Sequence, residues 1–104
     1  MIRKAFKMKV YPDKHEEYQK RHREIWPEMI EALHKHKARN YSIFLDEGTS
    51  TLFGYVEIED EVTWNMLAAS DINQRWWAYM ESVMETNSDK SPVTEDLKEV
   101  FHMA

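Results

Sequence analysis

The sequence lacks cysteine, has only two glycines and three prolines, and contains no long apolar run. Without cysteine the chain has neither a disulfide framework nor thiol chemistry, which fits a reducing cytoplasm. Gly48 and Gly54 stand in no motif that could make a glycine-rich phosphate loop. The N-terminal stretch alternates charged with apolar side chains, unlike a signal peptide, and no later segment is long enough to span a membrane. We therefore expect a cytoplasmic protein without a membrane partner.

Positive charge is also scarce, with 14 Lys and Arg against 19 Asp and Glu and a net charge of -5. Nucleic-acid binding depends on a clustered positive surface, so we expect no nucleic-acid partner. Five histidines are present, but none belongs to a metal-binding motif, and His34 and His36 would point to different sides of a helix. We expect no metal site.

The chain is short for the amount of large apolar side chain that it carries. Its 104 residues predict a single domain over 1–104. A domain of this size leaves much of its surface uncovered, yet the chain has four Trp, seven Met and 12% aromatic residues. This composition favours association with a second copy.

Hydrophobic periodicity predicts the element order strand, helix, strand, strand, helix, strand. Asp13 and Glu16 have the spacing of a capping box, which would start the first helix at Lys14. Pro27 should kink or restart that helix. The expected elements are a strand over 2–10, a helix over 14–37, a hairpin of strands 41–45 and 52–59, a helical stretch from Asp60 that bends at Ser70, and a strand over 97–103.

With right-handed crossovers, this order is typical of the ferredoxin-like βαββαβ arrangement, an α+β fold in which helices cover one face of an antiparallel sheet. The other face should carry apolar side chains that need their own cover. A second subunit packed sheet to sheet, as in a dimeric α/β barrel, would supply it. The side chains expected there are Tyr41 or Ile43, Leu52 or Phe53, and Val100 or Phe101.

The most unusual stretch places Tyr18, His22 and Trp26 four residues apart, on one stripe of a helix. Aromatic stripes at this spacing are more often core than active site. A buried Tyr and His both need hydrogen-bond partners, however, and His titrates near neutral pH. Aromatic walls beside a proton-transfer group suit a small polar ligand with an apolar face, such as a sugar.

A second unusual stretch is Trp76-Trp77. Adjacent helical residues point about 100° apart, so one indole could face the core and the other a cavity. The alternative is that both indoles only pack. Tyr41, at the start of the second strand, could approach the same pocket if the helix bearing His22 lies over the sheet.

Together, four segments of the chain resemble the L-rhamnose mutarotase family. They are His22-x-x-Ile25-Trp26-Pro27-Glu28, Asn40-Tyr41-Ser42-Ile43-Phe44-Leu45, Asp71-x-x-x-Arg75-Trp76-Trp77 and Glu99-Val100-Phe101. The resemblance implies a cytoplasmic, cofactor-free homodimer with a ferredoxin-like fold that interconverts the α and β anomers of L-rhamnose. It also implies that His22 is the acid/base residue, that Tyr18 and Tyr41 contact substrate, and that Trp76 and Trp77 bind the sugar. Lys37 departs from the Gly expected at the end of the first helix.

Mutarotation removes the proton of the anomeric hydroxyl, protonates the ring oxygen, and recloses the ring on the other face of the aldehyde. One acid and one base suffice. We expect His22 to protonate the ring oxygen and a tyrosine hydroxyl or a held water to relay the other proton. Two alternatives are a non-catalytic ligand-binding module on the same fold and a cofactor-independent monooxygenase, which would consume oxygen.

Overall fold

The computed structural model describes all residues from Met1 to Ala104 and confirms the predicted order of elements. No helix is both long and apolar enough to cross a membrane. Pro27 occupies the first turn of a new helix, so the long helix predicted from the sequence is two helices. The elements are β1 (Ile2–Lys9), α1 (His15–Arg23), α2 (Pro27–Lys35), β2 (Arg39–Asp46), β3 (Thr51–Ile58), α3 (Glu61–Ala68), α4 (Asp71–Met80) and β4 (Glu95–Leu97).

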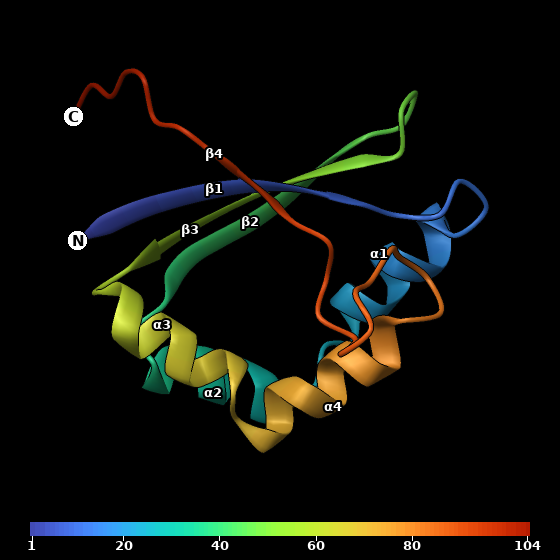
Figure 1. Cartoon of the computed structure of the whole chain (residues 1–104), viewed down its shortest axis with the longest axis horizontal. Helices are drawn as coiled ribbons and strands as arrows, with labels where there is room; N and C mark the ends of the chain where they lie inside the picture. The colour runs from blue at the N-terminus through green and yellow to red at the C-terminus, as the bar shows by residue number, and fades with distance from the viewer.

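The strands form one antiparallel sheet in the order β2-β3-β1-β4. All four helices lie on the same side of this sheet, and the opposite side is open (Figure 1). The fold is therefore the predicted ferredoxin-like α+β arrangement, with a single helical layer over a single sheet.

The core lies between the sheet and the helices. Alternate residues of β3, including Leu52, Val56 and Ile58, are fully enclosed there. Gly54 belongs to the same row, and the ring of Phe6 on β1 lies so close above it that an added Cβ would be 2.5 Å from the ring carbons. A glycine at this position lets the Phe6 ring lie flat over the sheet and form part of the floor under the helices.

Asp60 and Ser70, where the sequence predicts a helix start and a bend, are both helix caps, whereas the predicted capping box is absent. Asp60 accepts a hydrogen bond from the Thr63 amide at 2.7 Å and caps α3, and Ser70 caps α4. The capping box at Asp13 was wrong, because a turn between Tyr11 and Lys14 makes Lys14 the N-cap residue, and no side chain caps α1.

The last strand is shorter and lies earlier in the chain than the sequence pattern predicted, so that only Leu97 belongs to both the expected and the observed strand. It covers Glu95–Leu97 only, and residues 98–104 have no regular secondary structure. They leave the sheet beside the N-terminal end of β1 (Figure 1). Arg3 still contacts this segment through two hydrogen bonds to Glu99, at 2.7 and 3.1 Å.

The open face of the sheet differs in part from the expectation. Phe44 pairs directly with Phe53, and both lie on the open face, where Phe44 is 67% exposed. Of the expected residues, Phe53 is therefore confirmed, whereas Tyr41 and Ile43 turn toward the helices and line a cavity. This difference arises from an irregularity in β2 that is described below with the site.

Candidate active site

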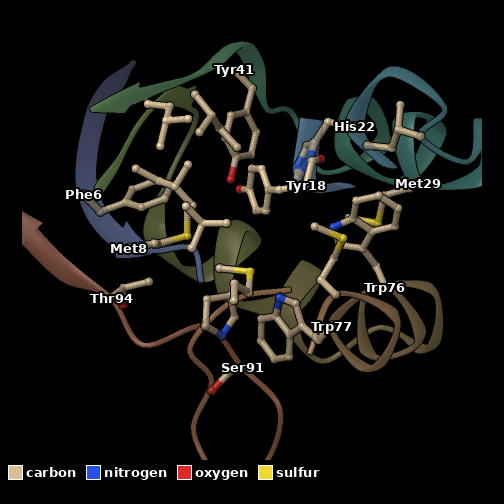
Figure 2. Close-up of a pocket in the computed structure, with 18 of the residues that line it drawn as sticks. Phe6, Met8, Tyr18, His22, Met29, Tyr41, Trp76, Trp77, Ser91 and Thr94 are labelled. Carbon is tan, nitrogen blue, oxygen red and sulfur yellow. The ribbon is translucent and has the colours of Figure 1, made fainter. Parts of the chain in front are cut away.

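A cavity of about 1200 Å³ lies between the helical layer and the inner face of the sheet. Residues from the strands, from the helices and from the segment before β4 line it. All five residues predicted for the site are among them, namely Tyr18, His22, Tyr41, Trp76 and Trp77 (Figure 2). The structure therefore brings together side chains from α1, β2 and α4.

Helix α1 contributes Tyr18 and His22 on adjacent turns of one face. Tyr18 is almost fully buried, and its ring centroid lies 4.4 Å from that of His22. The third member of the predicted stripe does not line the cavity. Trp26 follows the end of α1, caps α2 with extended backbone, and packs its indole edge-on against Trp76 at 5.1 Å. It supports the wall of the cavity from behind.

The imidazole of His22 is held in one tautomer. Its Nδ1 lies 3.0 Å from the backbone carbonyl oxygen of Tyr18, and because a carbonyl only accepts, Nδ1 is the protonated nitrogen that donates. The Nε2 lone pair is therefore free to accept a proton. Burial lowers the pKa of His22, and the carbonyl hydrogen bond opposes this effect. No charged group contributes to this pKa, so His22 is a neutral base at pH 7.

Helix α4 contributes the two indoles. Trp76 is buried, and its ring meets that of His22 edge-on with centroids 5.4 Å apart. Trp77 is partly buried and lies on the other side of the cavity from Tyr41 in Figure 2. As predicted, one indole, that of Trp77, faces the cavity. The indole of Trp76 packs in the core and also lines the cavity.

Tyr41 reaches the cavity because of a β-bulge. The pairing of β2 with β3 shifts between Arg39 and Ser42, and Asn40 adopts a left-handed conformation with φ 52°. The extra residue reverses the alternation of side chains, so Tyr41 points toward the helices and lies 6.2 Å from the ring of Trp64. The bulge is therefore what places this phenol in the site.

The hydroxyl groups of Tyr18 and Tyr41 point toward one another (Figure 2). Burial raises the pKa of both phenols, that of Tyr41 to about 12, and the neighbouring Tyr41 adds to the increase at Tyr18. Tyr41 as a residue is 38% exposed, but its hydroxyl end is enclosed in the cavity. Both groups stay protonated at neutral pH and can donate hydrogen bonds or protons.

Sequence reasoning missed several residues of the cavity wall. Trp64, on α3, was not assigned to the site, and Asn73 drew no attention although it lies three and four residues before Trp76 and Trp77. That spacing was the available signal, since it puts all three side chains on one face of a helix. Asn87 and Thr94, from the segment between α4 and β4, also line the cavity.

The chain has no group of three His, Asp or Glu side chains placed to hold a metal ion. The polar lining of the cavity includes instead the imidazole of His22, the phenols of Tyr18 and Tyr41 and the amide of Asn73. A neutral base beside two protonated phenols, enclosed by indoles, can move protons on a ligand of sugar size.

This site on a ferredoxin-like α+β scaffold defines a class of small enzyme that acts on its ligand by proton transfer. Comparison with known proteins identifies which one. A family model described as L-rhamnose mutarotase matches residues 3–103. The chain belongs to the L-rhamnose mutarotase family.

The L-rhamnose mutarotase of Oceanobacillus iheyensis is 65% identical over 99% of both chains. That of Enterococcus faecalis is 59% identical over 99% of this chain and 100% of the relative. Among solved structures, an L-rhamnose mutarotase from Formosa agariphila superposes over 100% of both chains with a TM-score of 0.92 and 38% identity. An antibiotic biosynthesis monooxygenase superposes with a TM-score of 0.64 over 96% of this chain and 99% of its own, but at 13% identity this likeness concerns the fold alone.

Proposed function

We propose that His22 is the proton carrier in the reaction of this family, the interconversion of the α and β anomers of L-rhamnose. The observation that carries the proposal is the hydrogen bond from His22 Nδ1 to the Tyr18 carbonyl, which leaves Nε2 as a base inside the cavity. A binding module would need no such base. The lowered pKa of His22 keeps that base available at neutral pH.

Ring opening begins when Nε2 of His22 takes the proton of the anomeric hydroxyl. The electron pair of the O–H bond forms the aldehyde C=O, the bond between the anomeric carbon and the ring oxygen breaks, and its electrons pass to the ring oxygen. That oxygen takes a proton from a phenol or a held water. After rotation of the aldehyde, the same transfers in reverse close the ring on the other face. This order gives His22 the base role first, in place of the acid role expected from the sequence.

Tyr18 and Tyr41 are the proposed partners at the ring oxygen, because both phenols are enclosed and protonated. Trp76 and Trp77 offer apolar surface for the methyl group and the C–H faces of the sugar. A pocket that merely accommodates a methyl group separates substrates by about 1–3 kcal/mol. We therefore expect related sugars to react, at lower rates.

The assembly that we propose is a cytoplasmic homodimer packed through the open faces of its sheets. Phe44 and Phe53 on that face support it, as do the exposed apolar side chains of Val100, Phe101 and Met103 in the C-terminal segment. A second copy would cover this apolar surface.

The function is tested by magnetisation exchange between the two anomeric proton signals of L-rhamnose, with wild-type protein and with the His22→Ala variant. A panel of ordinary and 6-deoxy hexoses gives the specificity. Removing the proton carrier should lower the exchange rate by about a hundredfold or more, whereas sugar binding should weaken only moderately because Tyr18 and the indoles remain.

Thermal unfolding on the same samples separates catalysis from stability. If His22 only packs, His22→Ala lowers the melting temperature while the rate per folded molecule stays near that of the wild type. Binding of L-rhamnose without any exchange in the wild-type protein would instead favour a non-catalytic module.

A further inference from the structure

Asn73 is a buried amide in the wall of the cavity. It is 6% exposed and lies on α4 at the start of a series, Asn73, Trp76, Trp77 and Met80, whose members all line the cavity. This spacing of three, four and seven residues is one face of a helix. Three of these side chains are apolar or aromatic, so the amide is the one polar interruption of the face.

The hydrogen bonds within the protein do not account for this amide. Its Nδ2 is 3.4 Å from the carbonyl oxygen of Ala68, at the long limit of a hydrogen bond. Gln74 already donates to the same carbonyl at 2.7 Å. The Oδ1 atom of Asn73 accepts from no group of the protein, yet no fully enclosed polar side-chain atom lacks a partner, so Oδ1 lies at the cavity surface.

An unpaired amide oxygen in a largely apolar wall is costly unless something in the cavity bonds to it. A primary amide offers an acceptor and two donors, which match a sugar hydroxyl, itself a donor and an acceptor. Trp77 lies one turn further along the same face, so a sugar ring against that indole brings its edge within reach of the amide.

We propose that Asn73 is a substrate-binding residue that bonds a non-anomeric hydroxyl of the sugar and thereby sets part of the specificity of the site. The anomeric hydroxyl and ring oxygen belong to His22 and the phenols, so Asn73 acts on the hydroxyls at C2, C3 or C4. This role rests on the proposed placement of the reacting atoms at His22.

The experiment follows the logic of a double-mutant cycle, in which one change is made in the enzyme and the other in the substrate. Anomer exchange is measured for L-rhamnose and for its 2-, 3- and 4-deoxy analogues, with wild-type protein and with Asn73→Leu, which keeps the volume and removes the amide. A hydrogen bond between neutral groups is commonly worth a factor of about 2 to 12. Asn73→Leu should lower kcat/KM for L-rhamnose by that factor and leave it unchanged for the one analogue that lacks the bonded hydroxyl.

Gln74→Met is the matched control, because it removes an exposed amide that bonds the Ala68 carbonyl but does not line the cavity. Any decrease in kcat/KM with Gln74→Met should be small and should be the same for all four sugars. An equal loss for all four sugars in Asn73→Leu, or no loss at all, would overturn the proposal.

A second measurement uses the wild-type chain, so it does not depend on the variant folding. The side-chain amide signals of Asn73 should shift when L-rhamnose saturates the site, and should shift less with the one deoxy analogue identified above. Amide signals that do not respond to L-rhamnose would also overturn the proposal. If exchange stays near the wild-type rate in His22→Ala while the Asn73 signals still shift with L-rhamnose, only the catalytic assignment of His22 fails and the Asn73 contact stands.

Discussion

At the scale of single residues, the chemistry of the site depends on which nitrogen of His22 carries the proton. The helix itself decides this, because the carbonyl of Tyr18, one turn earlier, accepts from Nδ1. His36 shows the same local arrangement, with Nδ1 2.7 Å from the Ala32 carbonyl, but it does not line the cavity. The tautomer is therefore fixed locally, by the hydrogen bond from Nδ1 to the carbonyl one helical turn earlier. Only at His22 does this leave the free Nε2 lone pair in the cavity.

The activity should depend on pH through the neutral form of His22. Its pKa is lowered by burial, so kcat/KM should be constant near neutral pH and fall only below the ordinary histidine value of about 6.5. The measurement is anomer exchange between about pH 4.5 and 8, corrected for the uncatalysed reaction. His36→Gln is the control and should leave the profile unchanged. A profile that is flat over this range would count against His22 as the proton carrier.

The same pKa shift predicts the sign of a stability change. Because the folded state holds His22 neutral, the unfolded chain takes up the proton first as pH falls. The contribution of His22 to the free energy of unfolding is fully present above about pH 6.5, the ordinary pKa of histidine in an unfolded chain. It is lost as pH falls through the lower pKa of the folded state. Urea unfolding at several pH values should show this loss in the wild type and not in His22→Ala.

A second residue-scale prediction concerns Lys37, which has a left-handed backbone with φ 65°. Its amide bonds the carbonyl of His34 while that of Ala38 bonds Leu33, which is the Schellman arrangement that usually ends in Gly. A left-handed backbone conformation costs a residue with a side chain about 1–2 kcal/mol. Replacing Lys37 with Gly removes this cost, but the greater conformational entropy of Gly in the unfolded chain offsets part of the stabilisation. Lys37→Gly should raise the melting temperature by about 4 °C, measured by circular dichroism.

Lys35→Gly is the matched control for this substitution. It removes the same charge two residues earlier, inside α2, where the backbone is right-handed. Glycine in a helix costs about 1 kcal/mol relative to good helix formers, so this variant should melt lower than the wild type. Equal melting temperatures for the two variants would contradict the strain assigned to Lys37.

Much of the site could be predicted from the sequence at this scale, since helical spacing identifies Tyr18 and His22 as one pair and the two consecutive indoles single out Trp76 and Trp77 as another. Trp26 was assigned to the same stripe, but the break before Pro27 turns it away from the cavity. Tyr41 was suggested for the site by its position at the start of the second strand and was assigned to it by the family resemblance. Periodicity could not place it, because a one-residue bulge reverses the alternation of side chains.

At the scale of elements, catalysis depends on how α1 is held against α4, because His22 belongs to one helix and Trp76 to the other. Arg21 joins the two. Its guanidinium donates to the Tyr79 carbonyl and to the Ser82 hydroxyl at the C-terminal end of α4, and lies 4.4 Å from the centre of the Tyr79 ring. A cation is favourable at a helix C-terminus, and Glu17 orients this one from the preceding turn of α1.

Arg21→Met should therefore lower kcat more than it raises KM. The methionine keeps the apolar stem but removes the hydrogen bonds, so α1 gains freedom relative to α4 while every side chain in the cavity remains. Small misplacements of a catalytic group reduce rates by about tenfold or more. The ring protons of His22 report the geometry directly, since the Trp76 and Tyr18 rings that surround them shift their NMR signals.

Lys20→Met removes one positive charge from the same turn of α1, but its exposed side chain makes no ion pair and does not line the cavity. It should leave both kcat and the His22 signals unchanged. If Arg21→Met lowers only the melting temperature, with normal kcat and normal signals, Arg21 contributes to stability alone.

The elements themselves were largely predictable, and the two errors have physical causes. Asp13 has the spacing of a cap, but the turn that closes at Lys14 moves the helix start beyond its reach. The alternating pattern over 97–103 predicts a strand, yet a strand needs a partner. The register that pairs Ala5 with Leu97 places position 101 opposite residue 1, so β1 offers no partner to the end of the pattern, and residues 98–100 leave the sheet although β1 continues opposite them.

At the scale of the whole molecule, the sheet is covered on one face only. All four helices lie on one side of the sheet (Figure 1). Phe44 and Phe53 form a cross-strand pair on the open face. A stable interface between two proteins buries about 800 Å² from each partner, so a dimer through this face would have to cover most of the sheet. Most of the Trp and Met residues noted in the sequence lie in the core or beside it, and Phe44 and Phe53 are the large apolar side chains that a second copy could cover on this face.

Phe44→Asp should separate the proposed homodimer without unfolding the chain. Phe44 is 67% exposed on the open face, so the isolated subunit loses little burial, whereas a carboxylate enclosed in a sheet-to-sheet interface would lack a partner. Val62→Asp is the control, because Val62 is 70% exposed on α3, on the helical side of the molecule. Sedimentation at micromolar concentration should give twice the 12.6 kDa chain mass for the wild type and for Val62→Asp, and the single mass for Phe44→Asp. A wild-type chain that sediments as a compact monomer would contradict the dimer, and a Phe44→Asp variant that remains dimeric would place the interface elsewhere than on the open face of the sheet.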